Sequence, residues 1–405
     1  MSKPPLVVGL DIGSYATKIL VAKERPDGRG FEVLGRGISL SSGVRKGVVN
    51  KRKKAIDTIS EALDQAEKEA GREIDSAYVN INGSHIFCIS SEGLVSVSRA
   101  DQKISDQDLK RVIDAAKTFS IPSNKEIIEV VPQEYVVDDQ GGIKEPLGLT
   151  GIRLEAKILA VGGFTPYIDN TSEVVLESGL EVNDIFLGSF AAAEAVLSDE
   201  EKELGVSVVD LGASTTSVSV FEDGEMIHTA VIPVGMQHIR NDIAIGLRVS
   251  IEAAEKILEE MGSHILGEAS SRKKVVDIPG GDKVTFKEEE LKNIAKARVE
   301  EIFELVDKEL QEVDRSGLLP AGIVLTGGGA KMENLVSFVK KKTELPVRTG
   351  APSTFYPSQE DPSLSTVCGL VQLGVKQTKG KGFIDFDFNS GLSRKIKKVF
   401  KIFIP

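Results

Sequence analysis

VVGLDIGSYATKILVAK (7–23) runs from an apolar strand into Asp11, an X-Gly turn and small hydroxyl side chains, and then into a second β-rich strand. VSVVDLGASTTSVSVF (206–221) repeats this pattern around Asp210. Each copy predicts a β-hairpin closed by a tight glycine turn. Glycine lets backbone N–H groups approach a polyphosphate closely, and hydroxyls add donors. Two facing hairpins would therefore hold a nucleotide from both sides, with Asp11 and Asp210 on hydrated Mg²⁺.

A third glycine-rich element lies near the far end of the chain. AGIVLTGGGAKMENLVSFVKK (321–341) predicts an apolar strand, a turn at Gly327–Gly329 and an amphipathic helix. Such strand-to-helix turns direct N–H groups at an anion and let the backbone pack against a base or ribose. Any one of these motifs is more often only a tight connection. The ordered set of three resembles the actin/Hsp70/sugar-kinase ATPase superfamily, which implies an α/β fold of two domains around a nucleotide cleft.

The composition agrees with a cytosolic α/β protein. The 405 residues allow two or three domains, and 41% apolar residues suffice for a large core. No signal peptide or stretch of transmembrane length is recognisable, and a net charge of −11 argues against nonspecific nucleic-acid binding. The cysteines, Cys88 and Cys368, have no metal or disulfide spacing, which favours a reducing compartment. The histidines are interpreted as structural: His85, His228, His238 and His264.

Apolar periodicity predicts several helices. One covers residues 55–70 with Gly71 as its C-cap, and the helix 365–376 ends the core. Two long charged helices, 250–262 and 287–314, bracket a turn at Pro279, Gly280 and Gly281. Residues 36–54 are rich in Gly, Ser and basic side chains and are predicted to be a solvated loop. Residues 83–163 carry strand and helix signals sufficient for an inserted subdomain.

The inserted segment narrows the resemblance to the bacterial cell-division actin homologues of the FtsA family. GSHIFCISSEGLVSVSRADQKISDQDLKRVIDAAK is similar to their subdomain 1C, and SSGVRKGVVN, PVGMQHIRNDIA and IVLTGGGAKMENL also match. The resemblance implies a 1C subdomain in place of actin's 1B and a C-terminal amphipathic helix. It implies these boundaries: 1–83, 164–193 and 360–376 for 1A, 84–163 for 1C, 194–245 and 318–359 for 2A, 246–317 for 2B, 377–390 for a linker and 391–405 for the helix.

The same resemblance implies an ATP- and Mg²⁺-binding protein that forms filaments and tethers the tubulin-like FtsZ to the membrane. It would be peripheral on the cytoplasmic face of the cell membrane at the division site, with other division proteins on 1C. The helix EEELKNIAKARVEEIFELV (288–306) resembles the one that receives the FtsZ C-terminal peptide. Arg298 falls at its recurrent arginine, suited to a carboxylate by its fork of donors. An ordinary solvated charge is the competing interpretation.

The expected nucleotide contacts combine the three motifs with the helix AAEKILEEMG (253–262), where Glu255 matches a position that meets the ribose or base. A lysine common three residues later is Leu258, and Lys256 is left as a possible substitute. The predicted contacts are Asp11, Gly13, Ser14, Tyr15, Lys18, Asp210, Gly212, Ser214, Thr215, Thr216, Glu255, Gly327, Gly328, Gly329 and Met332.

The expected hydrolysis is slow. Superfamily hydrolases usually carry a Glu, Gln or Asp in a linking helix to orient the attacking water. The matching stretch, LGSFAAAEAVL (187–197), has Gly188 and Ser189 where a Glu-Pro pair often stands, and leaves only Glu194 nearby. Positioning of a general base typically contributes 10²–10⁴-fold. No catalytic residue is assigned.

The last fifteen residues, GLSRKIKKVFKIFIP (391–405), predict a basic amphipathic helix. One stripe is apolar and the opposite side carries five cations and no acid, a pattern typical of an anchor on anionic membrane lipids. A helix docked on its own protein and a calmodulin-like target are the competing interpretations. The residues expected at the membrane are Leu392, Arg394, Lys395, Ile396, Lys397, Lys398, Val399, Phe400, Lys401 and Phe403.

Two other functions stay open at this point. The first is an actin-like, ATP-binding pilus-assembly protein, which the cationic tail and the 1C-like segment disfavour. The second is a sugar kinase or another phosphotransferase of this fold. No sugar-binding acid can be placed in the cleft motifs, which disfavours the kinase.

Overall fold

The repeat of the two hairpins organises the body of the protein. In the computed structural model, which describes residues 6–267, 271–278 and 283–379, β1 (Leu6–Ile12) pairs antiparallel with β2 (Ala16–Glu24). β12 (Val206–Leu211) pairs antiparallel with β13 (Thr216–Glu222) in the same way. Both predicted hairpins are therefore confirmed.

Each hairpin is the centre of a mixed sheet, and the two sheets share one topology. The orders are β3-β2-β1-β6-β11 and β14-β13-β12-β17-β18, so that in both an antiparallel meander continues into two parallel strands. β19 (Phe355–Tyr356) extends the first sheet beyond β3, although the predicted boundaries place it with 318–359. The other strands are β3 (Phe31–Leu40), β6 (Ser76–Ile81), β11 (Glu181–Leu187), β14 (Glu225–Ile232), β17 (Gly322–Thr326) and β18 (Val347–Thr349).

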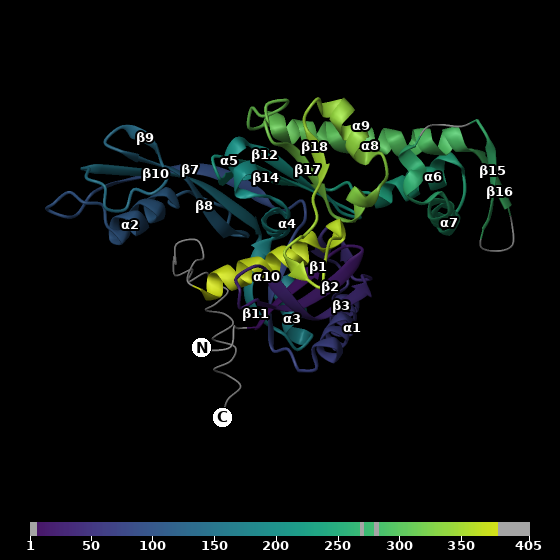
Figure 1. Cartoon of the computed structure of the whole chain (residues 1–405), viewed down its shortest axis with the longest axis horizontal. Coiled ribbons are helices and arrows are strands. Elements are labelled where there is room, and N and C mark those ends of the chain that lie inside the picture. Colours follow the sequence, from purple (N-terminus) through teal and green to yellow (C-terminus); the bar gives the residue numbers. More distant parts are fainter. Residues whose placement is uncertain (1–5, 268–270, 279–282, 380–405) are drawn as a thin grey trace.

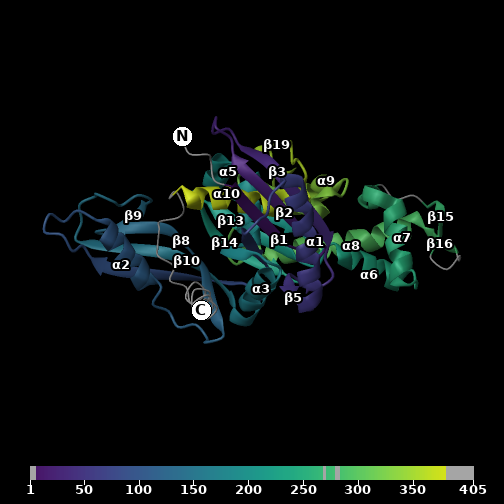
Figure 2. The ribbon, with the colours of Figure 1, turned by 90° about the horizontal axis from the view of Figure 1, so that it is seen from below.

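Helices cover both faces of the first sheet. α1 (Arg52–Ala70) lies along β2 and β3 (Figure 2). It ends at Gly71, whose φ of 68° forms the left-handed cap. α3 (Thr165–Glu177) packs beside α1. α10 (Ser365–Thr378) packs on β1 and on α4 (Gly188–Val196). The predicted helices 55–70 and 365–376 are confirmed.

The segment predicted as an insertion forms a small domain at one end of the long axis (Figure 1). Its antiparallel sheet has the order β7-β10-β8-β9, with α2 packed against β7 and β10. A separate core forms between them, with Leu109, Val112 and Leu154 among its buried side chains. The elements are β7 (Phe87–Ser96), α2 (Asp106–Ala116), β8 (Lys125–Val137), β9 (Gln140–Ile143) and β10 (Arg153–Phe164).

The opposite end of the molecule is mainly helical (Figure 1). It contains α6 (Gln237–Gly246), α7 (Ile251–Met261) and α8 (Glu288–Gln311), so the two predicted charged helices are confirmed. A hairpin of β15 (Lys273–Asp277) and β16 (Lys283–Lys287), which was not predicted, precedes α8. The predicted turn at Pro279–Gly281 lies outside the described residues. In the part of the chain that the structure describes, no helix combines the length and apolarity needed to cross a bilayer.

The prediction of a basic loop over residues 36–54 is wrong. Residues 36–40 belong to β3, a short hairpin of β4 (Val44–Arg45) and β5 (Val48–Val49) follows, and α1 begins at Arg52. The basic side chains of this segment are nevertheless exposed, as expected. Most of the predicted linker and all of the predicted amphipathic helix 391–405 lie outside the described residues.

Candidate nucleotide site

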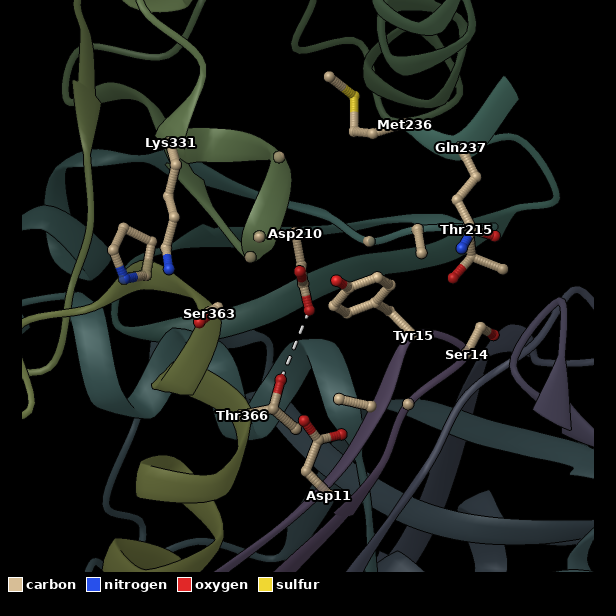
Figure 3. A pocket seen from close by; sticks show the side chains of 18 of the residues that line it. Asp11, Ser14, Tyr15, Asp210, Thr215, Met236, Gln237, Lys331, Ser363 and Thr366 are labelled. Atoms are coloured by element: carbon tan, nitrogen blue, oxygen red, sulfur yellow. Dashed lines mark hydrogen bonds between the residues drawn. The ribbon is translucent and has the colours of Figure 1, made fainter. Parts of the chain in front are cut away.

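A cleft of about 850 Å³ opens between the two sheets. The turns of both hairpins and the Gly327–Gly329 turn line it, together with α7 and the start of α10. Figure 3 shows Asp11 and Asp210 pointing into the same part of the cleft, with Thr366 next to Asp210 and the ring of Tyr15 projecting toward them. The fold thus brings together motifs that are more than 300 residues apart in the sequence.

The first hairpin presents a paired carboxylate. Asp11 and Lys18 face one another in the β1–β2 register, and Lys18 Nζ lies 2.9 Å from Asp11 Oδ2. Asn80 Nδ2 donates to the other carboxylate oxygen at 2.8 Å. Burial alone would lower the pKa of Lys18, but the charge and hydrogen bond of Asp11 raise it above its ordinary value. Lys18 therefore stays cationic in the cleft.

The turn of this hairpin is open to the cleft. A Cβ on Gly13 would lie 2.7 Å from the carbonyl oxygen of Ala16, so the tight turn requires glycine there. Ser14 Oγ accepts a hydrogen bond from the Gly47 N–H at 3.0 Å. Tyr15 is 62% exposed despite its size, because its ring extends into the cleft.

The second hairpin presents a carboxylate with few partners. Thr366 Oγ1 donates to Asp210 at a long 3.5 Å. Burial and the negative charge of Asp11 raise the pKa of Asp210 to about 6. Gly327, with a φ of 79°, packs so close that a Cβ would lie 2.1 Å from Asp210 Oδ1. The carboxylates of Asp11 and Asp210 therefore repel one another across the cleft. The glycine turn beside Asp210 has no side chain that would block a ligand.

This arrangement fits hydrated Mg²⁺. Burial and the charge of Asp11 together raise the pKa of Asp210, and a cation between the two aspartates would offset the charge repulsion. Within the described ranges no three His, Cys, Asp or Glu side chains converge to form a complete metal cage. Mg²⁺ commonly takes only one or two carboxylates and completes its shell with water and substrate phosphates, so the two aspartates are a sufficient protein contribution.

Nearly all predicted contacts line the cleft; the exceptions are Ser214 and Thr216. Ser214 Oγ accepts a hydrogen bond from the Lys46 N–H at 2.9 Å. Thr216 is buried and donates to the carbonyl oxygen of Val234 at 2.9 Å. Thr216 therefore uses its hydroxyl proton on the Val234 backbone. Ser214 only accepts a hydrogen bond here and keeps its O–H to donate, so its contact with the nucleotide stays a prediction. The other hydroxyl of that turn, Thr215, lines the cleft.

Sequence reasoning missed several cleft residues from distant segments. Lys331 follows the triple glycine and pairs with Asp361 at 2.6 Å. Ser363, in the short 3-10 turn before α10, and Thr366, in the first turn of α10, also line the cleft. Three further cleft residues lie at the start of α6, in the stretch PVGMQHIRNDIA: Met236, Gln237 and Arg240. In the sequence this stretch supports only the family resemblance, although the same match could have indicated nucleotide contacts.

On α7, Glu255 and Leu258 line the cleft, as the family resemblance implies for these two positions. Arg240 Nη1 lies 3.5 Å from Glu255 Oε1. Lys256 lies off the cleft and contacts Glu259 at 3.3 Å, so it does not take the place of the lysine that Leu258 replaces. This side of the cleft is therefore bounded by a carboxylate and an apolar side chain.

The linking helix α4 offers no carboxylate to the cleft. Gly188 begins this helix, and a Cβ there would lie 2.5 Å from Asn82 Nδ2. Asn82 lines the cleft, and its buried Oδ1 accepts no hydrogen bond from the described residues. Glu194 is 12% exposed and forms ion pairs with Lys202, at 3.2 Å, and with Lys376. Glu194 is therefore engaged away from the cleft and is not a water activator.

Arg298 is neither an open fork nor a solvated charge. It is 19% exposed, and its Nε and Nη2 donate to the two carboxylate oxygens of Asp242 at 2.6 and 2.8 Å. Glu301 contacts its remaining nitrogen. The guanidinium thus joins α8 to α6, and the competing interpretation of a solvated charge is wrong.

Comparison with known proteins identifies the family. A family model described as an SHS2 domain inserted in FtsA matches residues 83–161, and one described as cell division protein FtsA matches 207–369. FtsA of Pseudomonas aeruginosa is 38% identical over 382 residues, which cover 93% of this chain and 91% of that protein. The chain belongs to the FtsA family. FtsA of Bacillus subtilis is 35% identical over 94% of this chain and 86% of its own length.

Solved structures show the same fold as this FtsA-family chain. The PilM–PilN type IV pilus biogenesis complex matches with a TM-score of 0.66 at 16% identity, over 91% of this chain and 98% of the other. MreB5 of Spiroplasma citri bound to ADP matches with a TM-score of 0.52 at 15% identity, over 97% and 98%. The predicted actin-like α/β fold with an inserted FtsA-type domain is therefore confirmed.

Proposed function

We propose that this FtsA-family protein binds Mg·ATP in the cleft and acts as an adaptor that connects FtsZ to the membrane. One observation carries the nucleotide part: two topologically equivalent hairpins present Asp11 and Asp210 to one cleft, beneath the Gly327 turn. The hairpin N–H groups and hydroxyls suit the phosphates, and Lys18 adds a cation. Bound Mg²⁺ would screen the phosphates and offset the repulsion between the two aspartates.

Binding of ATP, rather than its hydrolysis, is the proposed trigger for self-association into filaments. This follows from α4, which begins at Gly188, contributes no side chain to the cleft and has its Glu194 held by two lysines. Weak ATPase activity is the most that such a site supports, because no side chain of α4 is positioned to orient an attacking water.

Asp210→Ala tests the nucleotide assignment. The variant should lose Mg-dependent ATP binding by at least about tenfold in titrations with a fluorescent ATP analogue, while its circular dichroism stays unchanged. Asp57→Ala is the matched control, because it removes an exposed aspartate on α1 away from the cleft. If Asp210→Ala binds Mg·ATP as tightly as the parent chain, the assignment is wrong.

The tethering part of the proposal rests on two surfaces. The basic amphipathic segment 391–405, outside the described residues, is proposed to bind anionic lipids and so to keep the protein on the cytoplasmic face of the membrane at the division site. The FtsZ C-terminal peptide is proposed to bind along α8, where a shallow groove is lined by Lys287, Glu289, Glu290, Asn293, Ile294 and Ala297. The inserted domain, which projects from the body, is proposed to contact other division proteins (Figure 1).

A further inference from the structure

Cys88, His228 and Glu309 form a cluster that lies outside the cleft and comes from three separate elements. Cys88 is on β7 of the inserted domain, His228 is on β14 at the edge of the second sheet, and Glu309 is near the end of α8. Cys88 Sγ lies 3.5 Å from His228 Nδ1, and His228 Nε2 lies 3.0 Å from Glu309 Oε2. The three side chains are therefore connected in one line, sulfur to imidazole to carboxylate.

The geometry fixes the direction of proton transfer. A carboxylate accepts hydrogen bonds only, so Nε2 of His228 carries the proton toward Glu309. Nδ1 then faces the sulfur with its lone pair and can take the thiol proton. The product is a thiolate beside an imidazolium that Glu309 stabilises, an arrangement that activates cysteine nucleophiles generally.

The titration behaviour agrees with this geometry. Burial alone would raise the pKa of the Cys88 thiol, but hydrogen bonds from His228 and from the Thr229 backbone leave it below its ordinary value, against a smaller opposing effect of Glu309. Burial would likewise lower the pKa of His228, but Cys88 and Glu309 raise it to about 9. Both shifts therefore favour the ion pair over the neutral thiol and imidazole.

We infer that Cys88 is a modification site, a reactive thiolate that exchanges with small disulfides at the junction between the inserted domain and the body. We propose small disulfides as the reagents because access is limited. Cys88 is half-buried, and the side chains of His228 and Glu309 are 12% and 29% exposed. The cluster is therefore partly open to solvent.

The exchange balances without another reactant. The Cys88 thiolate attacks one sulfur of R–S–S–R, a new S–S bond forms and the old one breaks. The second R–S⁻ leaves and takes the proton that His228 received from the thiol. Cys88 is oxidised as the reagent disulfide is reduced, and the products are the mixed disulfide and one free thiol, R–SH.

An adduct on Cys88 would act on a domain junction. β14 packs against β7, β8 and β10 of the inserted domain, and Gln133 Nε2 on β8 donates to the Met226 carbonyl oxygen at 3.4 Å. Cys88 itself packs against the hydrophobic core beneath these strands. The R group would replace the contact of Cys88 with His228 and loosen the packing of the inserted domain on the body.

The chain contains its own control thiol. Cys368 on α10 is fully buried, and burial raises its pKa far above the ordinary value. Reaction of the full-length protein with 4,4′-dithiodipyridine, followed by thiopyridone release and by mass spectrometry of each cysteine peptide, compares the two directly. At about pH 6, Cys88 should react about tenfold faster than free cysteine, with the ratio falling toward pH 9 as the free thiol ionises. Cys368 should stay unmodified.

Two variants connect the reactivity to the cluster. His228→Gln should slow the reaction of Cys88 at about pH 6 by about tenfold and restore the steep pH dependence of a free thiol, whereas Cys368→Ser should change neither. If His228→Gln does not fold, the pH profile of the parent chain still decides. A Cys88 rate at pH 6 no greater than that of free cysteine overturns the inference, and so does an unchanged rate and pH profile in folded His228→Gln.

Discussion

Arg298 donates two hydrogen bonds to the carboxylate of Asp242, at 2.6 and 2.8 Å, and so fastens α8 to α6 beside the cleft. Such charge-assisted bidentate pairs are worth about 1.5–3 kcal/mol when they are shielded from water. Arg298→Glu breaks the pair and sets two carboxylates against each other. We expect it to lower the melting temperature by a few degrees, whereas Lys296→Glu, on an exposed position of the same helix, should have little effect.

Because Arg298 is bound to Asp242, a test of its role in binding the FtsZ C-terminal peptide needs a variant of each residue. If Arg298 contacts the peptide directly, Arg298→Glu should weaken peptide affinity, and Asp242→Ala, which releases the guanidinium, should preserve or raise it. Equal losses in both variants would mean that Arg298 acts only through the helix pair. Unchanged affinity in Arg298→Glu, measured by fluorescence anisotropy, would exclude the arginine from peptide binding.

The pKa of Asp210 predicts a pH-dependent stability of the ligand-free protein. Its folded value of about 6 lies above the ordinary 3.8, so the folded state binds more protons, and stability falls as pH rises through this window. Asp210→Asn removes that effect. In EDTA at about pH 7.5 it should stabilise the protein by on the order of 1–3 kcal/mol in urea unfolding, and the gain should disappear toward pH 4. An equal gain at both pH values would contradict the charge explanation.

The hairpins, the triple-glycine turn and the inserted domain could be predicted because each depends on local sequence signals. The end of strand β3 could not be predicted, because glycine-rich segments are typical of loops. Gly37 faces α1, and a Cβ there would lie 1.7 Å from the carbonyl oxygen of Ala62. A Cβ on Gly35 would lie 2.4 Å from the carbonyl oxygen of Ala66. These residues are glycine because a helix packs against the strand, which is a tertiary cause that composition does not reveal.

The site shows the same division. Asp11 and Asp210 can be recognised from the glycine turns that follow them. Thr366 and Gln237 carry no such local signal and are brought to the cleft by the tertiary fold. Ser214 matches the motif but does not line the cleft, and its hydroxyl oxygen accepts a hydrogen bond from the Lys46 N–H. His228 was interpreted as structural because no ligand spacing surrounds it, and Cys88 approaches it only across a domain junction.

Turnover of ATP should be slow because Gly188 stands where the family resemblance expects a water-orienting acid, and Asn82 lies beside it at the cleft. Gly188→Glu alone would clash with Asn82, because even a Cβ at this position would lie 2.5 Å from Asn82 Nδ2. The double variant Asn82→Ala with Gly188→Glu removes this clash and should raise phosphate release by at least about tenfold. Fast multiple-turnover release by the parent chain, without a partner, would contradict the proposal of binding without hydrolysis.

The apolar stripe of the C-terminal segment should drive membrane binding. Phe400→Glu removes a side chain whose full burial is worth about 1.5–3 kcal/mol and sets a charge against the acyl chains, so it should release the protein from anionic vesicles. Ser393→Glu adds the same charge without removing an apolar group and should weaken binding less. High salt should weaken the parent chain through its five cations. Vesicle flotation with parallel ATP titration separates these effects from loss of fold.

Co-sedimentation of a labelled FtsZ C-terminal peptide with anionic vesicles, in Mg·ATP, tests the adaptor function most directly. The full-length protein should carry the peptide into the vesicle pellet. Deletion of 391–405 should leave both in the supernatant, with ATP affinity unchanged. If the deleted protein still brings the peptide to the vesicles, or if vesicle-bound full-length protein brings none, this chain does not connect FtsZ to the membrane as proposed.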